Sequence, residues 1–225
     1  MAHKKQGYRF ENDYEKDDLN DSLKNWGQAL TLPVDVEIKA EHQILSMENA
    51  KELLENAELI ARMNCICRTT KKNCDSPIDN CMSLNDRAKM ILNNEIYQER
   101  NPRPIDIDEA LELLRGSHEA GLVHMAYAVN DQDINELCSC CSCCCVALSA
   151  ILRYGLYPHL LTKIMIEETD SLKCIDCGVC VDRCQFGARQ MIEGKLVVDQ
   201  LICYGCGLCI GHCSNDAIKL NKVNP

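Results

Sequence analysis

Eight cysteines near the C-terminal end have a spacing that suits metal chemistry. The pattern Cys-x2-Cys-x2-Cys-x3-Cys begins at Cys174 and again 29 positions later at Cys203. A cubane [4Fe–4S] cluster needs four thiolates around a compact core, and the x2 spacing wraps three of them on one loop. In an arrangement with two clusters, the fourth cysteine of each run ligates the other cluster. The predicted ligand sets are Cys174, Cys177, Cys180 with Cys213, and Cys203, Cys206, Cys209 with Cys184.

Two all-thiolate structural zinc sites are the alternative for this segment. Their ligands usually come as two separate Cys-x2-Cys pairs and not as runs of four. Gly178, Gly205 and Gly207 let the backbone turn closely around a cluster and aim N–H groups at its sulfurs. The spacing therefore favours clusters over zinc here.

The segment from about residue 163 to 223 resembles the bacterial-type ferredoxins with two [4Fe–4S] clusters. The resemblance rests on the two cysteine runs. It implies the pseudo-twofold (βαβ)2 ferredoxin fold and one-electron transfer at low potential. One departure is that Gln185 and Ser214 replace the proline that usually follows the fourth cysteine. This departure bears on cluster potential and loop rigidity more than on ligation.

Ten further cysteines are not needed by such a module. The upstream group of four is Cys65, Cys67, Cys74 and Cys81, and the compact run is Cys138, Cys140, Cys141, Cys143, Cys144 and Cys145. Four thiols in one loop, with the positive charge of Arg68 nearby, are enough for a third cubane. Zinc, or free and shared thiols, are the alternatives for this group.

The compact run of six thiols is harder to assign. Side chains of an extended backbone alternate between two faces, so six thiols in eight residues cannot all meet one small cluster without sharp turns. Either the run supplies two sites, one of them shared with the upstream group, or it holds an unusual cluster with more than four thiolates. A simpler reading leaves two or three of these cysteines buried and inert. We expect one or two further Fe–S clusters from the ten cysteines together.

The region from about Pro33 to Tyr154 resembles a family of four-iron proteins of anaerobes. The resemblance rests on three segments, Cys65–Arg68, Gly121–His124 and the run Cys138–Cys145, which precede a two-cluster ferredoxin module. It implies an iron–sulfur protein that works in electron transfer, without identifying a substrate. His118, His124 and His212 are alternative ligands, because imidazole can replace thiolate on iron. More often such histidines satisfy local hydrogen bonds.

Composition narrows the class of protein. The 225 residues include 18 cysteines, and no leader-like apolar segment follows Met1, so we expect a cytoplasmic chain whose thiols bind metal. The apolar stretch from Val146 to Ile166 is interrupted by charged residues and a proline, which argues against membrane insertion. A net charge of −10 argues against nucleic acid and is compatible with a basic protein partner. No nucleotide, flavin or zinc-hydrolase motif is present, and no catalytic residue is assigned.

These sites need elements to position them, and the sequence predicts an α+β protein in three parts. Residues 1–32 are expected to form an extended arm, residues 33–160 a cysteine-rich α+β domain, and residues 161–225 the ferredoxin domain. The expected strands and extended segments are 34–38, 60–67, 122–129, 164–166, 196–198 and 217–220. The expected helices are 47–59 with Ser46 as N-cap, 84–99, and one capped by Asp106 or Asp108 that ends at Gly121.

The leading functional hypothesis is an electron-transfer protein that links a donor and an acceptor redox enzyme, alone or inside a larger oxidoreductase complex. Its two C-terminal clusters and one or more upstream clusters would form the path, with the protein setting position and potential. One alternative is a reductase subunit or reductive activator with a substrate-reactive or noncubane cluster at Cys138–Cys145. Another is an iron–sulfur or metal carrier. An electron-transfer protein or complex subunit is favoured over a stand-alone enzyme.

Overall fold

A computed structural model describes residues 8–23, 26–32, 50–129, 134–156, 161–162 and 165–222. The helices are α1 (Lys16–Leu23), α2 (Ala50–Glu55), α3 (Ile66–Lys71), α4 (Asn85–Asn93), the 3-10 helix η2 (Glu95–Arg100), α5 (Ile107–Glu119), α6 (Val146–Tyr154) and α7 (Val179–Arg183). The strands are β1 (Trp26–Leu32), β2 (Ile60–Met63), β3 (Cys81–Leu84), β4 (Arg103–Ile105), β5 (Val123–Val129), β6 (Glu136–Cys140), β7 (Leu161–Thr162), β8 (Met165–Thr169), β9 (Arg189–Ile192), β10 (Lys195–Val198) and β11 (Ile218–Lys222).

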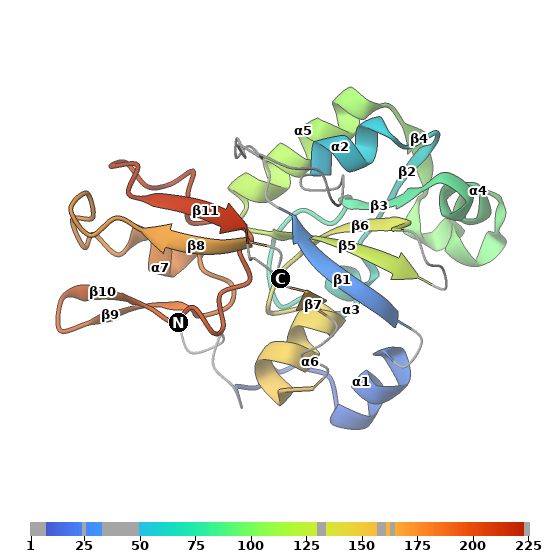
Figure 1. Ribbon diagram of the computed structural model, residues 1–225. Coiled ribbons are helices and arrows are strands. Elements are labelled where there is room, and N and C mark those ends of the chain that lie inside the picture. Colours follow the sequence, from blue (N-terminus) through green and yellow to red (C-terminus); the bar gives the residue numbers. More distant parts are fainter. Residues whose placement is uncertain are drawn as a thin grey trace.

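A seven-stranded sheet organises the upstream part of the chain, with strand order β4-β2-β3-β6-β5-β1-β7 (Figure 1). All pairs are antiparallel except β1 with β7. The register places Cys81 opposite Cys138, and Cys138 opposite Met125. Strands far apart in the sequence therefore bring the upstream cysteines and the compact run together.

Helices cover the two faces of this sheet, α2 and α5 on one side and α1, α3 and α6 on the other (Figure 1). On the α5 side, Leu54 and Leu114 pack with Ala126 and Leu137 in a core that contains no cysteine among its buried residues. On the α6 side, Met125 belongs to a core that includes buried cysteines and extends into the C-terminal part of the chain. The sheet thus separates a core of apolar side chains on its α5 side from a core that includes cysteines on its α6 side.

The C-terminal part forms two small antiparallel sheets, β8 with β11 and β9 with β10. Its first half follows the expected strand–helix–strand order, with α7 between β8 and β9. In the second half the chain between β10 and β11 has turns at residues 208–212 where the repeat would place a second helix. The two halves are therefore similar in strands and unequal in helix content.

Several predicted elements are found with shifted ends. The helix expected after Asp106 is α5, and the Asp106 side chain accepts a hydrogen bond from the Glu109 N–H at 2.8 Å. The single helix expected at 84–99 is divided at Asn94, whose extended backbone ends α4 and whose side chain caps η2. The extended segment expected at 60–67 ends at Met63, because Cys65 is already the N-cap of α3.

The extended arm expected for residues 1–32 is wrong where the structure describes it. This segment contains helix α1, whose Leu19 and Leu23 are buried against α6, and strand β1, which lies inside the large sheet between β5 and β7. Apolar positions of the arm are therefore core positions of the sheet domain. Strand β7 also belongs to this sheet, although the sequence assigns residues 161–162 to the C-terminal domain.

The strand expected at 34–38 and the Ser46 cap lie outside the described residues, and α2 is the described part of the helix expected at 47–59. Within the described ranges no helix has both the length and the apolar character that crossing a membrane requires.

Candidate metal centres

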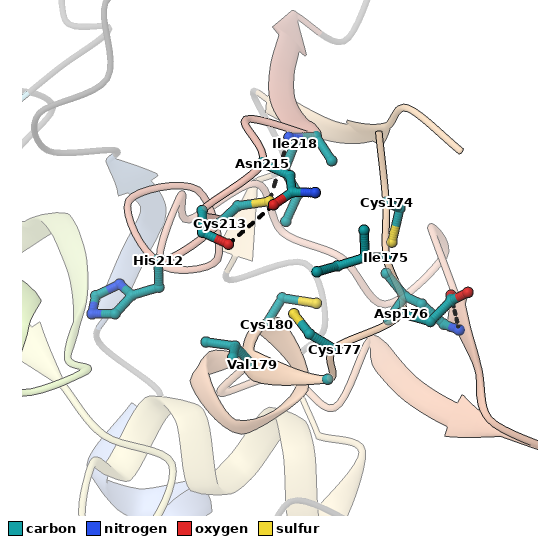
Figure 2. A pocket seen from close by; sticks show the side chains of 14 residues that line it. Cys174, Ile175, Asp176, Cys177, Val179, Cys180, His212, Cys213, Asn215 and Ile218 are labelled. Carbon is teal, nitrogen blue, oxygen red and sulfur yellow. Dashed lines mark hydrogen bonds between the residues drawn. The ribbon is translucent and has the colours of Figure 1, made fainter. Parts of the chain in front are cut away.

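The eight C-terminal cysteines gather around two cavities. The first is lined by Cys174, Cys177, Cys180 and Cys213 (Figure 2). The second is lined by Cys184, Cys203, Cys206 and Cys209. Each cavity thus combines three cysteines of one run with the fourth cysteine of the other, which is the grouping expected from the spacing.

Close backbone turns bring these thiols together. Gly178, with φ +78°, is the N-cap of α7 and lies between Cys177 and Cys180. Gly205, with φ +62°, lies so close to β8 that a Cβ there would be 2.2 Å from the Met165 carbonyl oxygen. A side chain is therefore excluded at Gly205, and the loop that carries Cys203 and Cys206 rests directly on β8.

A buried ion pair and buried thiols lie at the two cavities. The Arg189 guanidinium donates to the Cys180 sulfur at 3.4 Å, and it pairs with the buried Glu167 carboxylate. Burial raises the pKa of Cys209 to about 12 and that of Cys206 well above its usual value. Thiolates at these positions need a cationic partner inside the protein, because burial disfavours the charged form. The donor set therefore fits an iron–sulfur core, whose irons supply that positive charge.

A third group of four thiols is the most compact in the described part of the chain. Cys74, Cys141, Cys143 and Cys144 place their sulfurs within 4.8 Å of one another. Cys74 follows α3, whereas the other three lie on the sharp turn between β6 and α6. The sequence groups Cys74 with Cys65, Cys67 and Cys81. In the structure, its sulfur lies instead among those of Cys141, Cys143 and Cys144.

Polar side chains fix the geometry of this four-thiol group. The buried Arg68 donates to the Ser139 carbonyl at 2.9 Å and lies 3.8 Å from the Cys141 sulfur. The Asn73 amide donates to the Cys143 carbonyl at 3.0 Å. The arginine of the Cys-x-Cys-Arg segment thus holds the loop after α3 against the end of β6.

The remaining six upstream thiols line a cavity of about 470 Å³. They are Cys65, Cys67, Cys81, Cys138, Cys140 and Cys145, with Cys141 and Cys144 of the four-thiol group at its border. The walls also carry Arg68, Arg87 and Arg100. Interactions with Cys67 and Cys81, helped by the charge of Arg68, lower the pKa of Cys65 to about 2. The cavity therefore combines crowded thiols with positive charge.

The six thiols of the compact run are thus divided between two groups, the four-thiol group and the six-thiol cavity. Cys138 and Cys140 point to the α6 side of the sheet, opposite to Ser139. The turn at residues 142–144 then redirects Cys143 and Cys144 toward Cys74. Convergence of these thiols requires a sharp turn in the backbone, and residues 142–144 form one.

The histidines lie apart from the thiol groups. The His124 ring is fully buried, its Nδ1 lies 3.0 Å from the Ser139 hydroxyl, and it stacks on His118 with ring centroids 6.1 Å apart. Burial, together with the charge of His118, lowers the pKa of His124 to about 3. His212 lines the first C-terminal cavity, but its ring points away from the sulfurs (Figure 2). Among the described residues, none of the three histidines belongs to a group of closely spaced ligand atoms.

Sequence reasoning missed the side chains that join the cysteine segments. Gln185 accepts hydrogen bonds from the Ser142 hydroxyl at 2.8 Å and the Ser142 N–H at 3.2 Å, and it donates to the Gly121 carbonyl at 2.8 Å. Tyr14 donates to the Cys144 carbonyl at 2.9 Å and lines the six-thiol cavity. Only Gln185 had a sequence signal, since it replaces the usual ferredoxin proline.

Comparison with known proteins identifies a cluster-binding segment at the first cysteine run. Residues 167–190 match the 4Fe-4S binding domain family, over the segment that contains Cys174, Cys177, Cys180 and Cys184. No curated protein matches the chain. With this domain and its many clustered cysteines, the chain fits an iron–sulfur protein of the electron-transfer class that carries a 4Fe-4S binding domain.

Proposed function

We propose that the protein carries single electrons between two redox proteins through two C-terminal [4Fe–4S] clusters and at least one upstream cluster. The observation that carries this proposal is the gathering of the eight C-terminal cysteines around two cavities, in two exchanged sets. The ligands would be Cys174, Cys177, Cys180 and Cys213 for one cluster, and Cys203, Cys206, Cys209 and Cys184 for the other. The clusters supply the redox chemistry, and the chain supplies position and potential.

The two sets are adjacent and differ in exposure. The Arg189 guanidinium donates a hydrogen bond to the Cys180 sulfur of the first set. It also lies close enough to Cys209 of the second set for the two groups to interact electrostatically. Cys177 is exposed, as is Ile175 beside it. Cys184, in contrast, is buried in the core that continues to Cys140 and Cys145. Electrons would enter at the exposed first set and move inward through the second.

Hydrogen bonds connect the second set to the segment that carries the upstream thiols. Gln185 follows Cys184 in the chain and bonds to Ser142, which lies between Cys141 and Cys143. Phe186 and Leu208 pack in the same core as Cys140 and Cys145. The six-thiol cavity has more thiols than one cubane uses, so it supports a further Fe–S cluster at the inner end of the path.

The cavity also favours the second candidate function, a reductase subunit or activator. A space of about 470 Å³ beside Cys138 and Cys140 could admit a small substrate to a cluster bound there. This function requires a coordination position that is open to a ligand. Spectral changes of the upstream cluster on adding small anions or thiols would support it, whereas an inert spectrum would favour simple electron transfer.

The test is a count of iron and acid-labile sulfide per chain on anaerobically purified protein, followed by a reductive titration. We expect at least about twelve irons, since two cubanes account for about eight. Cys177→Ser should lower the iron content and remove one low-potential signal. About eight irons in the wild type would overturn the upstream cluster, and an unchanged count in Cys177→Ser would overturn the ligand assignment.

A further inference from the structure

The sulfur positions of the four-thiol group differ from those of the other thiol sets. The Cys74 sulfur lies 3.8 Å from that of Cys141 and 3.9 Å from that of Cys144, and the Cys143 and Cys144 sulfurs are 3.8 Å apart. A tetrahedral zinc ion with Zn–S bonds of about 2.3 Å separates its ligand sulfurs by about 3.8 Å. Three of the six sulfur pairs thus have the separation expected for ligands of one zinc ion, and all four sulfurs lie within 4.8 Å of one another.

A cubane requires a wider arrangement. Each of its four thiolates binds a different iron at a different corner of the core, so the sulfurs cannot approach as closely as ligands of one ion. The C-terminal sets give an internal reference. Throughout the described ranges, no other group of three or more potential ligands brings all its ligand atoms within 4.8 Å of one another. The four-thiol group is thus more compact than the sets that match the 4Fe-4S pattern.

We propose that Cys74, Cys141, Cys143 and Cys144 bind a single zinc ion in a closed, structural site. All four tetrahedral positions are taken by thiolates, and Cys141 and Cys144 are buried, as in structural zinc sites. Arg68 lies 3.8 Å from the Cys141 sulfur, so its positive charge offsets part of the negative charge of the thiolates.

The ion would cross-link two segments that are far apart in the sequence. Cys74 lies in the loop between α3 and β3, and the other three ligands lie on the turn that leads into α6. Both segments also carry thiols of the six-thiol cavity, namely Cys67 before the loop and Cys145 after the turn. Zinc at this position would fix the walls of that cavity without taking part in electron transfer.

Zinc and iron analysis of anaerobically purified wild type, Cys143→Ser and Cys177→Ser tests the site. We expect about one zinc per chain in the wild type. Cys143→Ser should lose the zinc and keep the wild-type iron count, and the matched variant Cys177→Ser should lose iron and keep the zinc. No zinc in the wild type, a single iron in its place, or full zinc content in Cys143→Ser would overturn the proposal.

Should Cys143→Ser fail to fold, zinc-edge X-ray absorption of the wild type decides the question. Four sulfur neighbours at about 2.3 Å support the site, whereas oxygen or nitrogen neighbours overturn it. The proposal is independent of the electron-transfer function. Zinc can be present in a protein that carries no electrons, and reducible clusters can be present in a protein without zinc.

Discussion

Single polar side chains hold the cysteine segments together. The fork of Arg68 donates to the Pro77 carbonyl, to Asn80 at 3.2 Å and to the Ser139 carbonyl at 2.9 Å, and a lysine could not make these bonds in the same directions. Gln185 performs a similar role between the C-terminal module and the compact run. Residues next to the ligands thus decide how the thiol groups are placed relative to one another.

Gln185→Ala should weaken the attachment of the C-terminal module. The change removes three hydrogen bonds in a part-buried position, each of which contributes about 1 kcal/mol, so we expect a loss of about 2–3 kcal/mol. Ser214→Ala is the matched control, because Ser214 occupies the same position of the second run and bonds only to its exposed neighbour Asn215 in the described contacts. Anaerobic thermal unfolding measures both. Equal stability of the two variants would contradict the role of Gln185.

Gly205→Ala should displace the loop that carries Cys203 and Cys206. A Cβ at this position would collide with the backbone of Met165 at 2.2 Å, and backbone cannot move aside like a flexible side chain. We expect loss of one cluster's iron, about four per chain. Gly194→Ala is the control, since Gly194 has φ +78° and open space around it, so only a backbone cost of about 1–2 kcal/mol is expected. Full iron content in Gly205→Ala would show that the loop is not packed as described.

At the scale of elements, the segment before α1, which contains Asp13 and Tyr14, packs over the thiols on the α6 side of the sheet. Arg153 of α6 pairs with the Asp13 carboxylate and donates to the Ser142 carbonyl, and Tyr14 donates to Cys144. Lys71 of α3 donates to the Asp13 carbonyl at 2.9 Å. The N-terminal segment is therefore bonded to α3, to α6 and to the turn that carries the compact run.

Asp13→Asn should weaken the packing of this segment and lower the stability of the protein. Both partners of the Asp13–Arg153 pair are 1% exposed, and breaking such a buried pair costs about 3–5 kcal/mol. Burial alone would raise the pKa of Asp13, but the hydrogen bonds from Arg153 and from the Tyr14 N–H, together with the charge of Arg153, outweigh burial, so the pKa is lowered. The contribution is therefore present above the unfolded pKa of about 3.9 and lost as the pH falls through the folded pKa, so the comparison belongs at neutral pH.

Thermal unfolding and the rate of iron loss to a ferrous chelator measure the effect of Asp13→Asn. Iron loss should become faster, because Tyr14 lines the six-thiol cavity and depends on this segment for its position. Glu15→Gln is the control, since Glu15 pairs with Arg9 at an exposed position and such pairs contribute about 0–1 kcal/mol. Identical unfolding of both variants would remove the argument for a stabilising role of this segment.

Local signals in the sequence predicted the elements that depend on neighbouring residues. The Asp106 cap, strand β5 and the two cysteine runs are all visible within a few residues. The position of Cys74 was not predictable in this way, because it depends on the pairing of β3 with β6 across more than fifty residues. The same holds for β1, whose polar flanks suggest an arm until the partner strand β5 is known.

Helix α6 shows a second reason for a missed element. Its apolar residues face a core made partly of thiols, and in the sequence alone this apolar stretch indicates only whether it could cross a membrane. Arg153 interrupts that stretch, which argues against membrane insertion, and in the structure Arg153 is buried because Asp13, Ser142 and Ser149 accept its hydrogen bonds. A buried cation needs partners that sequence order does not reveal.

At the scale of the whole molecule, the two faces of the large sheet depend on metal to different extents. The core between the sheet and α5 includes Leu54, Met82 and Leu114 and contains no cysteine among its buried residues. The core on the α6 side includes buried cysteines, and the large buried apolar side chains in the described C-terminal part are few: Met165, Phe186, Leu208 and Ile218. Metal should therefore stabilise one side of the molecule far more than the other.

Removing iron and zinc with a chelator under reducing conditions should unfold the protein in part. We expect the amide hydrogens of β8–β11 to exchange quickly, because metal binding supplies the folding energy that this small core lacks. Amides of α5 and of the strands that face it, such as β5 and β6, should keep much of their protection, since their apolar core needs no metal. Hydrogen exchange with mass spectrometry distinguishes the two regions, and the metal-loaded protein is the control. Uniform loss of protection would mean instead that the thiol groups and the apolar core fold as one cooperative unit.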